Sequence, residues 1–130
     1  GKDAHAPGFY LHIEPGGCFM GMGIWHPDGK TLRTIREGLA EDPAGWRKAV
    51  GGKRFADRFE LGGDTLTRPP RGFDPEHPLI DDLKRKDFVA MAPLTQTQLT
   101  AGGFLEEFAG ACKVGSPFMA YLCKLLGHPY

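Results

Sequence analysis

The chain is poor in the residues on which serine hydrolases, disulfide-bonded domains and basic nucleic-acid-binding proteins depend. It contains a single serine, Ser116, and three cysteines, and 16 basic residues balance 16 acidic ones among 130. Ser116 lies between a glycine and a proline, a context typical of a helix N-cap rather than of a catalytic G-x-S-x-G turn. Three cysteines in apolar surroundings are typical of buried free thiols in a reducing compartment. Zero net charge argues against a nucleic-acid partner.

Long apolar runs are also lacking. The longest stretch without charge, residues 88–105, contains a proline, two glutamines and three threonines, which makes it too polar to span a bilayer. The chain does not open with a charged and then an apolar segment, so we expect no signal peptide. These features predict a cytoplasmic protein with no membrane partner.

Motifs for metals and dinucleotides are absent from the sequence. There is no H-E-x-x-H, C-x-x-C or aspartate-rich loop, and Gly21-x-Gly23 precedes no phosphate-binding helix pattern. His12 and Glu14 share a strand face, and folding could bring His26 or His77 towards them, but two ligands do not make a site. We therefore expect neither a metal nor a cofactor.

The apolar periodicity predicts one α+β domain over residues 1–130. We expect an N-terminal β-hairpin in a mainly antiparallel sheet packed with several helices, followed by a C-terminal helical pair. The hairpin covers residues 8–25, where apolar and polar residues alternate before the glycine-rich turn at residues 15–17. Further strands are expected at residues 59–61, 65–67 and 88–92. Helices are expected from residue 28 to about 39 and at 43–50, 53–59, 78–86, 104–113 and 117–126.

Charge is scarce in the last third of the chain. Between residues 88 and 130 the charged residues are Glu106, Glu107, Lys113 and Lys124. The last predicted helix is apolar around most of its circumference, as helices buried on several sides are. Because one small domain has little room to cover such a helix, we expect a second subunit or a further segment to pack on it.

Several stretches resemble a known family. They read Gly8-Phe9-Tyr10-Leu11-His12-Ile13-Glu14-Pro15-Gly16-Gly17, Gly21-Met22-Gly23-Ile24-Trp25-His26-Pro27, Thr34-Ile35-Arg36, Arg68-Pro69-Pro70-Arg71-Gly72-Phe73-Asp74, His77-Pro78 and Leu83-Lys84-Arg85-Lys86-Asp87-Phe88. Over nearly its whole length the chain resembles the bacterial and fungal conserved hypothetical proteins known as domain of unknown function 2461. That family has no assigned reaction, so the resemblance implies a fold rather than an activity.

The resemblance also implies a missing part. Family members carry an N-terminal signature, Arg-x-x-Arg-Asp-x-Arg-Phe followed by a lysine and a tyrosine, which nothing in this sequence matches. The chain therefore resembles the C-terminal part of a longer family domain. If that signature forms half of a site, the other half lies in the residues present here, and the missing segment would also cover the apolar last helix.

The first candidate site comprises Tyr10, His12 and Glu14, which strand alternation places on one face of the hairpin. A two-residue turn would set His12 opposite Gly21 and Tyr10 opposite Gly23, leaving room for a ligand beside the polar side chains. A three-residue turn would pair His12 with Met20 and close that space. The alternative interpretation is a solvent-facing strand whose glycines relieve twist or form a bulge.

Arg68 and Arg71 form the second candidate site. The prolines between them favour polyproline II, in which residues three apart project from the same side at a spacing of about 9 Å. Two guanidiniums on a stiff loop suit a phosphate or a carboxylate. The alternative is that they pair with Asp64, Asp74 or Glu76.

Two functions therefore stay open. In the first, the polar hairpin face binds an anionic small molecule, with Arg68 and Arg71 holding the anion and His12 and Glu14 as candidate catalytic or hydrogen-bonding groups. The sequence does not decide whether such a site is enzymatic. In the second, the apolar C-terminal helices mediate self-association or bind another protein, and the hairpin face is ordinary exterior.

Overall fold

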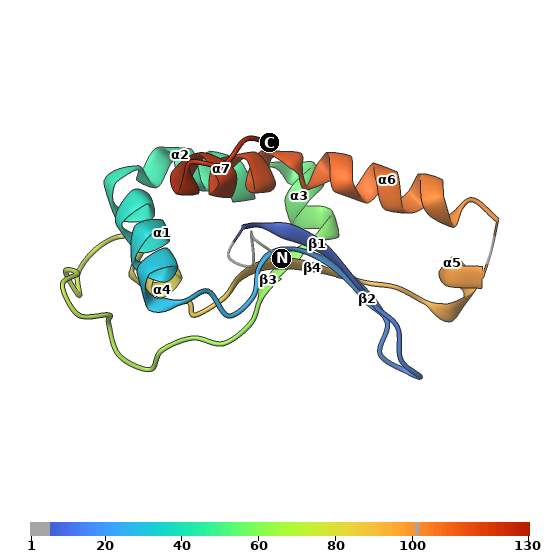
Figure 1. The fold of residues 1–130 in the computed structure, drawn as a ribbon, viewed down its shortest axis with the longest axis horizontal. Coiled ribbons are helices and arrows are strands. Elements are labelled where there is room, and N and C mark those ends of the chain that lie inside the picture. The colour runs from blue at the N-terminus through green and yellow to red at the C-terminus, as the bar shows by residue number, and fades with distance from the viewer. Residues whose placement is uncertain (1–5, 101) are drawn as a thin grey trace.

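The computed structural model describes residues 6–100 and 102–130 (Figure 1). Four strands form an antiparallel sheet in the order β1-β2-β4-β3, with bounds β1 Gly8–His12, β2 Phe19–Ile24, β3 Glu60–Gly62 and β4 Phe88–Pro93. The helices are α1 Gly29–Glu41, α2 Pro43–Gly51, α3 Lys53–Arg58, α4 Ile80–Leu83, α5 Gln96–Thr100, α6 Phe104–Val114 and α7 Ser116–Leu126. The predicted α+β fold, with its N-terminal hairpin and C-terminal helical pair, is confirmed.

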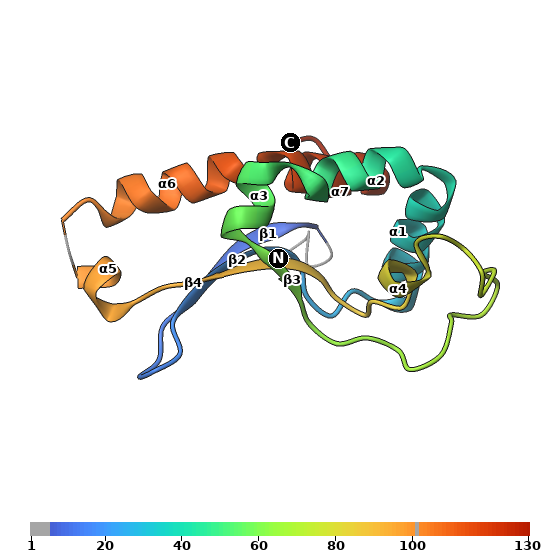
Figure 2. The ribbon, with the colours of Figure 1, turned by 180° about the vertical axis from the view of Figure 1, so that it is seen from behind.

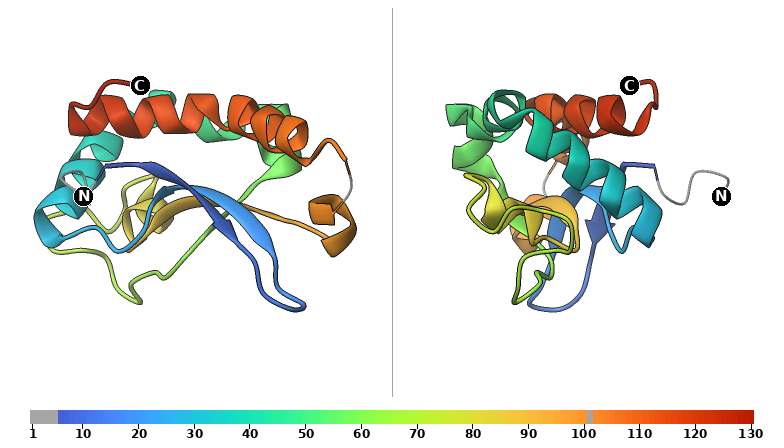
Figure 3. Two further views of the ribbon diagram at one scale, coloured as in Figure 1. Left: turned by 45° about the vertical axis from the view of Figure 1, so that its right-hand side comes forward. Right: turned by 90° about the vertical axis from the view of Figure 1, so that its left-hand side faces the viewer.

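The sheet is covered on one face. Figures 1 and 2 show α2, α3, α6 and α7 in a layer along one side of the strands, with α1 and α4 at one end and α5 at the other. Within residues 6–100 and 102–130, no helix lies on the opposite face, as the left view of Figure 3 also shows. We call this side of the sheet, which no described helix covers, the open face.

Alternation along β2 explains this one-sided packing. Met20, Met22 and Ile24 are buried among the helices, and Gly21 and Gly23, which alternate with them on the other face of the strand, are buried as well. Because glycine has no side chain, that face of β2 offers little apolar surface for a helix layer to cover.

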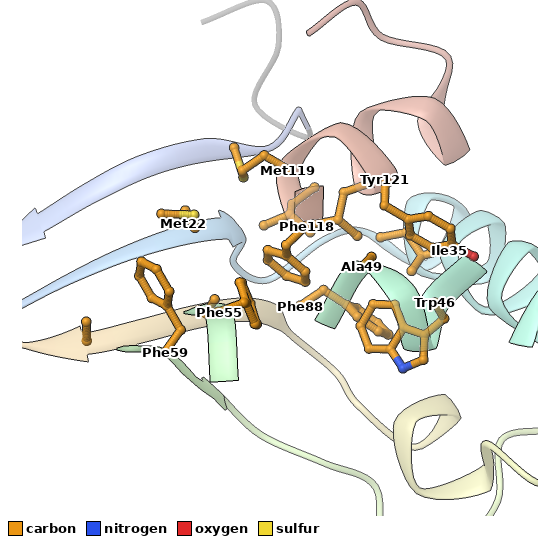
Figure 4. Close-up of a cluster of buried hydrophobic side chains, with 14 of the residues drawn as sticks. Met22, Ile35, Trp46, Ala49, Phe55, Phe59, Phe88, Phe118, Met119 and Tyr121 are labelled. Atoms are coloured by element: carbon orange, nitrogen blue, oxygen red, sulfur yellow. The ribbon is translucent and has the colours of Figure 1, made fainter. Parts of the chain in front are cut away.

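Aromatic rings fill the space between the sheet and the helices (Figure 4). The ring centroid of Trp46 lies 6.0 Å from that of Phe88 and 6.2 Å from that of Phe118, both edge-on. The indole N–H of Trp46 donates to Asp82 Oδ2 at 3.0 Å, so the buried ring also has its polar atom paired.

Local signals place the first two helices correctly. Asp28 caps α1, since its carboxylate accepts the Thr31 N–H at 2.8 Å, and Asp42 caps α2 in the same way through the Gly45 N–H at 3.1 Å. Pro43 occupies the first turn of α2, where its missing N–H costs nothing.

Two local predictions need correction. The strand expected at residues 65–67 is a single bridge between Thr65 and Arg85, and the helix expected at 78–86 is the short α4. The reason is a competing main-chain pairing: Leu66 N donates to Lys84 O at 2.7 Å, and Lys86 N donates to Asp64 O at 2.8 Å. These bonds end the helix.

The sequence reading also missed α5, which begins with a reciprocal capping box. Thr95 N donates to Gln98 Oε1 at 2.8 Å, and Gln98 N donates to Thr95 Oγ1 at 3.0 Å. The Thr-x-x-Gln spacing carried that signal in the sequence.

The chain itself covers most of α7. Its buried residues are Phe118, Met119, Tyr121, Leu122 and Cys123. The expectation that one small domain lacks room for this helix is therefore wrong, because α1, α2 and β2 pack against it. An exposed apolar side chain occurs instead on α6, where Leu105 is 79% exposed. None of the described helices is both long and apolar enough to cross a membrane.

Candidate functional site

The hairpin register differs from both predicted pairings. Tyr10 lies opposite Gly21, and His12 lies opposite Phe19. The turn expected at the glycines does form, since Gly17 N donates to Glu14 O at 3.1 Å, but it belongs to a longer connection over residues 13–18. The predictions that His12 faces Gly21 or Met20 are therefore wrong.

Phe19 occupies the surface beside His12. The two rings stack with their centroids 4.9 Å apart and an angle of 22° between their planes. His12 Nε2 also contacts Glu14 Oε1 at 3.1 Å, with both side chains exposed. The structure thus brings this predicted pair together, and it does so near the tip of the hairpin.

Tyr10 contacts the other end of the sheet face. Its hydroxyl donates to Gly23 O at 3.3 Å, and its ring packs edge-on against Trp25 with centroids 6.5 Å apart. Trp25 in turn lies 5.8 Å from the ring of His26. Tyr10 is therefore part of a row of rings that ends at His26, a residue to which the sequence analysis gave no role of its own.

A buried carboxylate fixes this end of the row. Asp87 is 1% exposed, and its Oδ1 accepts the His26 N–H at 2.8 Å while its Oδ2 accepts the Asp64 N–H at 2.9 Å. The same Oδ1 lies 3.5 Å from His26 Nδ1. One carboxylate thus joins the end of β2, the start of β4 and the loop after β3.

His26 has an unusual backbone conformation. Its φ is +48°, the one positive value at a non-glycine position among the described residues. A side chain in this left-handed region costs about 1–2 kcal/mol, and such strain clusters at functional sites. The imidazole is nevertheless 80% exposed, so core packing does not account for the strain.

The arginine loop begins at this same place. Asp64, whose N–H binds Asp87, starts the loop, and a Cβ at Gly72 would lie 3.8 Å from the Arg33 guanidinium on α1. In Figures 1 and 2 this loop lies beside α1 and α4, at the opposite end of the molecule from the hairpin turn. The loop that carries Arg68 and Arg71 thus begins at the Asp87 carboxylate, which also contacts His26.

Both arginines are exposed, and neither has an ion pair or hydrogen bond with residues 6–100 or 102–130. The alternative pairing with Asp64, Asp74 or Glu76 does not occur in this structure. The guanidiniums are consequently available to an anion from solution.

Comparison with known proteins gives a family and nothing more. The family model described as "Conserved hypothetical protein (DUF2461)" matches residues 1–121. The chain belongs to this family. No curated protein and no solved structure matches the chain. For this DUF2461 member, function therefore has to be argued from the site itself.

We also examined metal binding and cysteine-based catalysis as possible functions of this DUF2461 chain. Among the residues that the structure describes, no three histidines, cysteines or carboxylates come close enough to hold a metal ion. Burial raises the pKa of the Cys112 and Cys123 thiols, which makes both poor nucleophiles at neutral pH.

The half-buried Arg36 adds positive charge near the same end of the molecule. Its Nη2 donates to Arg85 O at 2.9 Å, while its Nε is buried without a partner among the described residues. Burial lowers the pKa of this guanidinium, which nevertheless keeps its charge at physiological pH.

Proposed function

We propose that this chain binds a small anionic molecule at the His26 end of its open sheet face. The observation that carries the proposal is the contact between the buried Asp87 carboxylate and His26, whose imidazole stays exposed although its backbone is strained. A strained residue held by a buried carboxylate, with its functional group facing solvent, is the pattern expected of a binding group.

The orientation of the imidazole supports this role. Nδ1 lies beside the Asp87 carboxylate, so Nε2 is the ring nitrogen left for a ligand. Proteins use a carboxylate next to a histidine to fix the ring for hydrogen bonding or proton transfer. His26 is accordingly the residue we expect to touch the ligand, and Asp87 is a positioning residue.

Neighbouring groups supply the rest of the site. Trp25 and Tyr10 offer aromatic surface beside His26, which suits the non-polar part of a ligand. Arg68 and Arg71, on the loop that begins at Asp64, supply unpaired positive charge for its anionic group. His12 and Glu14 remain a candidate acid–base pair near the tip of the hairpin, at the far end of β1.

A thermal-shift panel tests the proposal. Its probes are inorganic phosphate, sulfate, sugar phosphates, nucleotides and dicarboxylates, because a ligand that binds the native state alone raises the melting temperature. We expect at least one anion to stabilise the parent chain and to have no effect on His26→Gly or on Arg68→Ala/Arg71→Ala. The matched control is His128→Ala, which removes an imidazole outside the proposed site and should respond like the parent. If every responding anion stabilises the His26 variant equally, or if none responds, the proposal is wrong.

Self-association through the C-terminal helices is the second candidate function. Leu105 on α6 is 79% exposed beside the partly buried Phe104 and Phe108, an apolar cluster of the kind found at protein interfaces. Light scattering across a wide concentration range tests it, with Leu105→Glu as the variant. A monomer at every concentration would exclude this candidate.

A further inference from the structure

A hollow lies within the helical layer, apart from the open sheet face. Figures 1 and 2 show the α2–α3 corner beside the α6–α7 corner. Between them is a cavity of about 660 Å³, a volume typical of ligand sites. Its apolar lining comes from Ala49, Phe55, Val114 and Pro117, and its charged lining from Lys48, Lys53, Arg54 and Lys113.

The charges around this hollow all have one sign. The lining contains four cations and no carboxylate, although the chain as a whole is neutral. Lys53 has an acidic partner, Asp57, at 2.8 Å, whereas Lys48, Arg54 and Lys113 have none among the described residues. Cations gathered around a recess raise the local concentration of anions.

The floor of the hollow is apolar and preformed. Ala49 and Phe55 are buried, and Phe55 is held between Phe59 and Phe118 with ring centroids 5.3 and 5.6 Å away. Contact with this apolar floor does not stabilise a bare phosphate or sulfate. It does stabilise a bound hydrocarbon or aromatic group, because burial of apolar surface from water lowers the free energy. The ligand that uses both features is an anion with an apolar body.

The groove also extends beyond this volume. An adjoining hollow of about 300 Å³ shares Lys48, Ala49 and Pro117 with it and is also lined by Asp42, Tyr121 and Lys124. The extension gives room for an elongated apolar body along α2 and α7.

We propose that this groove is a binding site for an amphiphilic anion, in which a carboxylate or phosphate ester is attached to a short hydrocarbon or aromatic body. The cations hold the head group, and the floor formed by Phe55, Val114 and Pro117 holds the body. This site is separate from the His26 site, and either can exist without the other.

The test is a fluorescence titration with 8-anilinonaphthalene-1-sulfonate, a dye that has the required anionic group and aromatic body. Competition then identifies the chemistry, with octyl phosphate, octanoate, octanol and inorganic phosphate as competitors. We expect octyl phosphate or octanoate to displace the dye, and the stronger of the two identifies the head group. Octanol lacks the anionic head group and inorganic phosphate lacks the apolar body. Each should therefore need a concentration at least about tenfold higher to displace the dye.

Variants locate the dye. Lys48→Ala/Lys113→Ala should weaken its binding about tenfold. The matched control, Arg47→Ala/Lys30→Ala, removes the same charge outside the groove and should bind as the parent does.

Gly110→Leu tests the volume. A Cβ at Gly110 meets no atom within 4 Å, so this lining position has room for a side chain, and a leucine there should take up part of the groove. We expect loss of dye binding, with Gly110→Ala keeping it and melting curves confirming that both variants fold. Equal weakening by both double variants, unchanged binding by Gly110→Leu, or displacement by inorganic phosphate as strong as by octyl phosphate would each overturn the proposal.

Discussion

Asp87 accepts a hydrogen bond of 2.8 Å from the backbone N–H of His26, which lies 61 residues earlier in the chain. The same carboxylate accepts the Asp64 N–H at 2.9 Å, so two segments depend on one side chain that is 1% exposed. This hydrogen bond stabilises the fold and also fixes the backbone of His26, whose imidazole we propose as a binding group.

Replacement of the Asp87 carboxylate should therefore destabilise the fold. In Asp87→Asn one oxygen becomes an N–H₂ group, so the N–H of His26 or of Asp64 loses its acceptor. We expect the free energy of unfolding to fall by about 1–3 kcal/mol, the cost of a buried unpaired donor. Urea denaturation measures it. Asp81→Asn is the control, since that side chain is 97% exposed and should change stability by less than about 0.5 kcal/mol.

The backbone conformation of His26 predicts an inverted order of stability. At ordinary positions alanine is more stable than glycine, but at a φ of +48° the Cβ of alanine carries a steric cost that glycine avoids. We expect His26→Gly to be more stable than His26→Ala by about 1 kcal/mol. Both variants lose the imidazole, so its contact with Asp87 cancels in the comparison. If thermal or urea denaturation ranks alanine above glycine, the left-handed conformation is not present in solution.

Two glycines on the open face of β2 should differ sharply in their tolerance of a side chain. Gly23 has a φ of +126°, and a Cβ there would lie 2.0 Å from Phe88 O in the neighbouring strand. We expect Gly23→Ala to cost at least about 2 kcal/mol, from backbone strain together with a steric clash. Gly21→Ala is the matched variant, because its Cβ would lie 3.4 Å from Ala90 O, so it should cost less than half as much. Similar losses for the two variants would contradict this account of Gly23.

The sequence predicted the elements whose signals are local. The helix starts near residues 28 and 43, the hairpin on either side of its glycine-rich turn, and the two C-terminal helices were predicted from signals that lie within a few residues, and the structure confirms these elements. The predicted hairpin register was wrong because the register depends on how close to the turn the pairing of the two strands extends. There the ring of His12 stacks on Phe19, and residues 13–18 stay outside the ladder.

The candidate sites also divide into features with a local sequence signal and features that depend on long-range contacts. Arg68 and Arg71 were found from the polyproline spacing between them, but the loop that carries them is tied to Asp87 by the Asp64 N–H. No periodicity relates Asp87 to His26, because their contact depends on which ends of β2 and β4 meet. Likewise, Lys48 and Lys113 line one groove only because α2 and α6 both pack against α3.

Alkaline pH should destabilise the fold through Tyr121. Its hydroxyl lies 3.2 Å from Asp42 Oδ2 and 3.3 Å from Asp42 O, and burial together with the nearby carboxylate raises its pKa to about 12. An unfolded tyrosine has a pKa of about 10, so between these values the native state holds a proton that the unfolded state has lost. This stabilisation is complete below pH 10 and is lost as the pH rises towards 12.

Replacement by phenylalanine isolates that contribution. Tyr121→Phe should lose about 1 kcal/mol at pH 9, because the hydrogen bonds to Asp42 are gone. From pH 9 to pH 11 the stability of the parent should fall by about 1 kcal/mol more than that of the variant, since phenylalanine has no proton to lose. Urea denaturation at the two pH values measures this difference. Tyr130→Phe, at an exposed position, should follow the parent, and equal slopes for the parent and Tyr121→Phe would show that the contact with Asp42 does not hold the phenolic proton in solution.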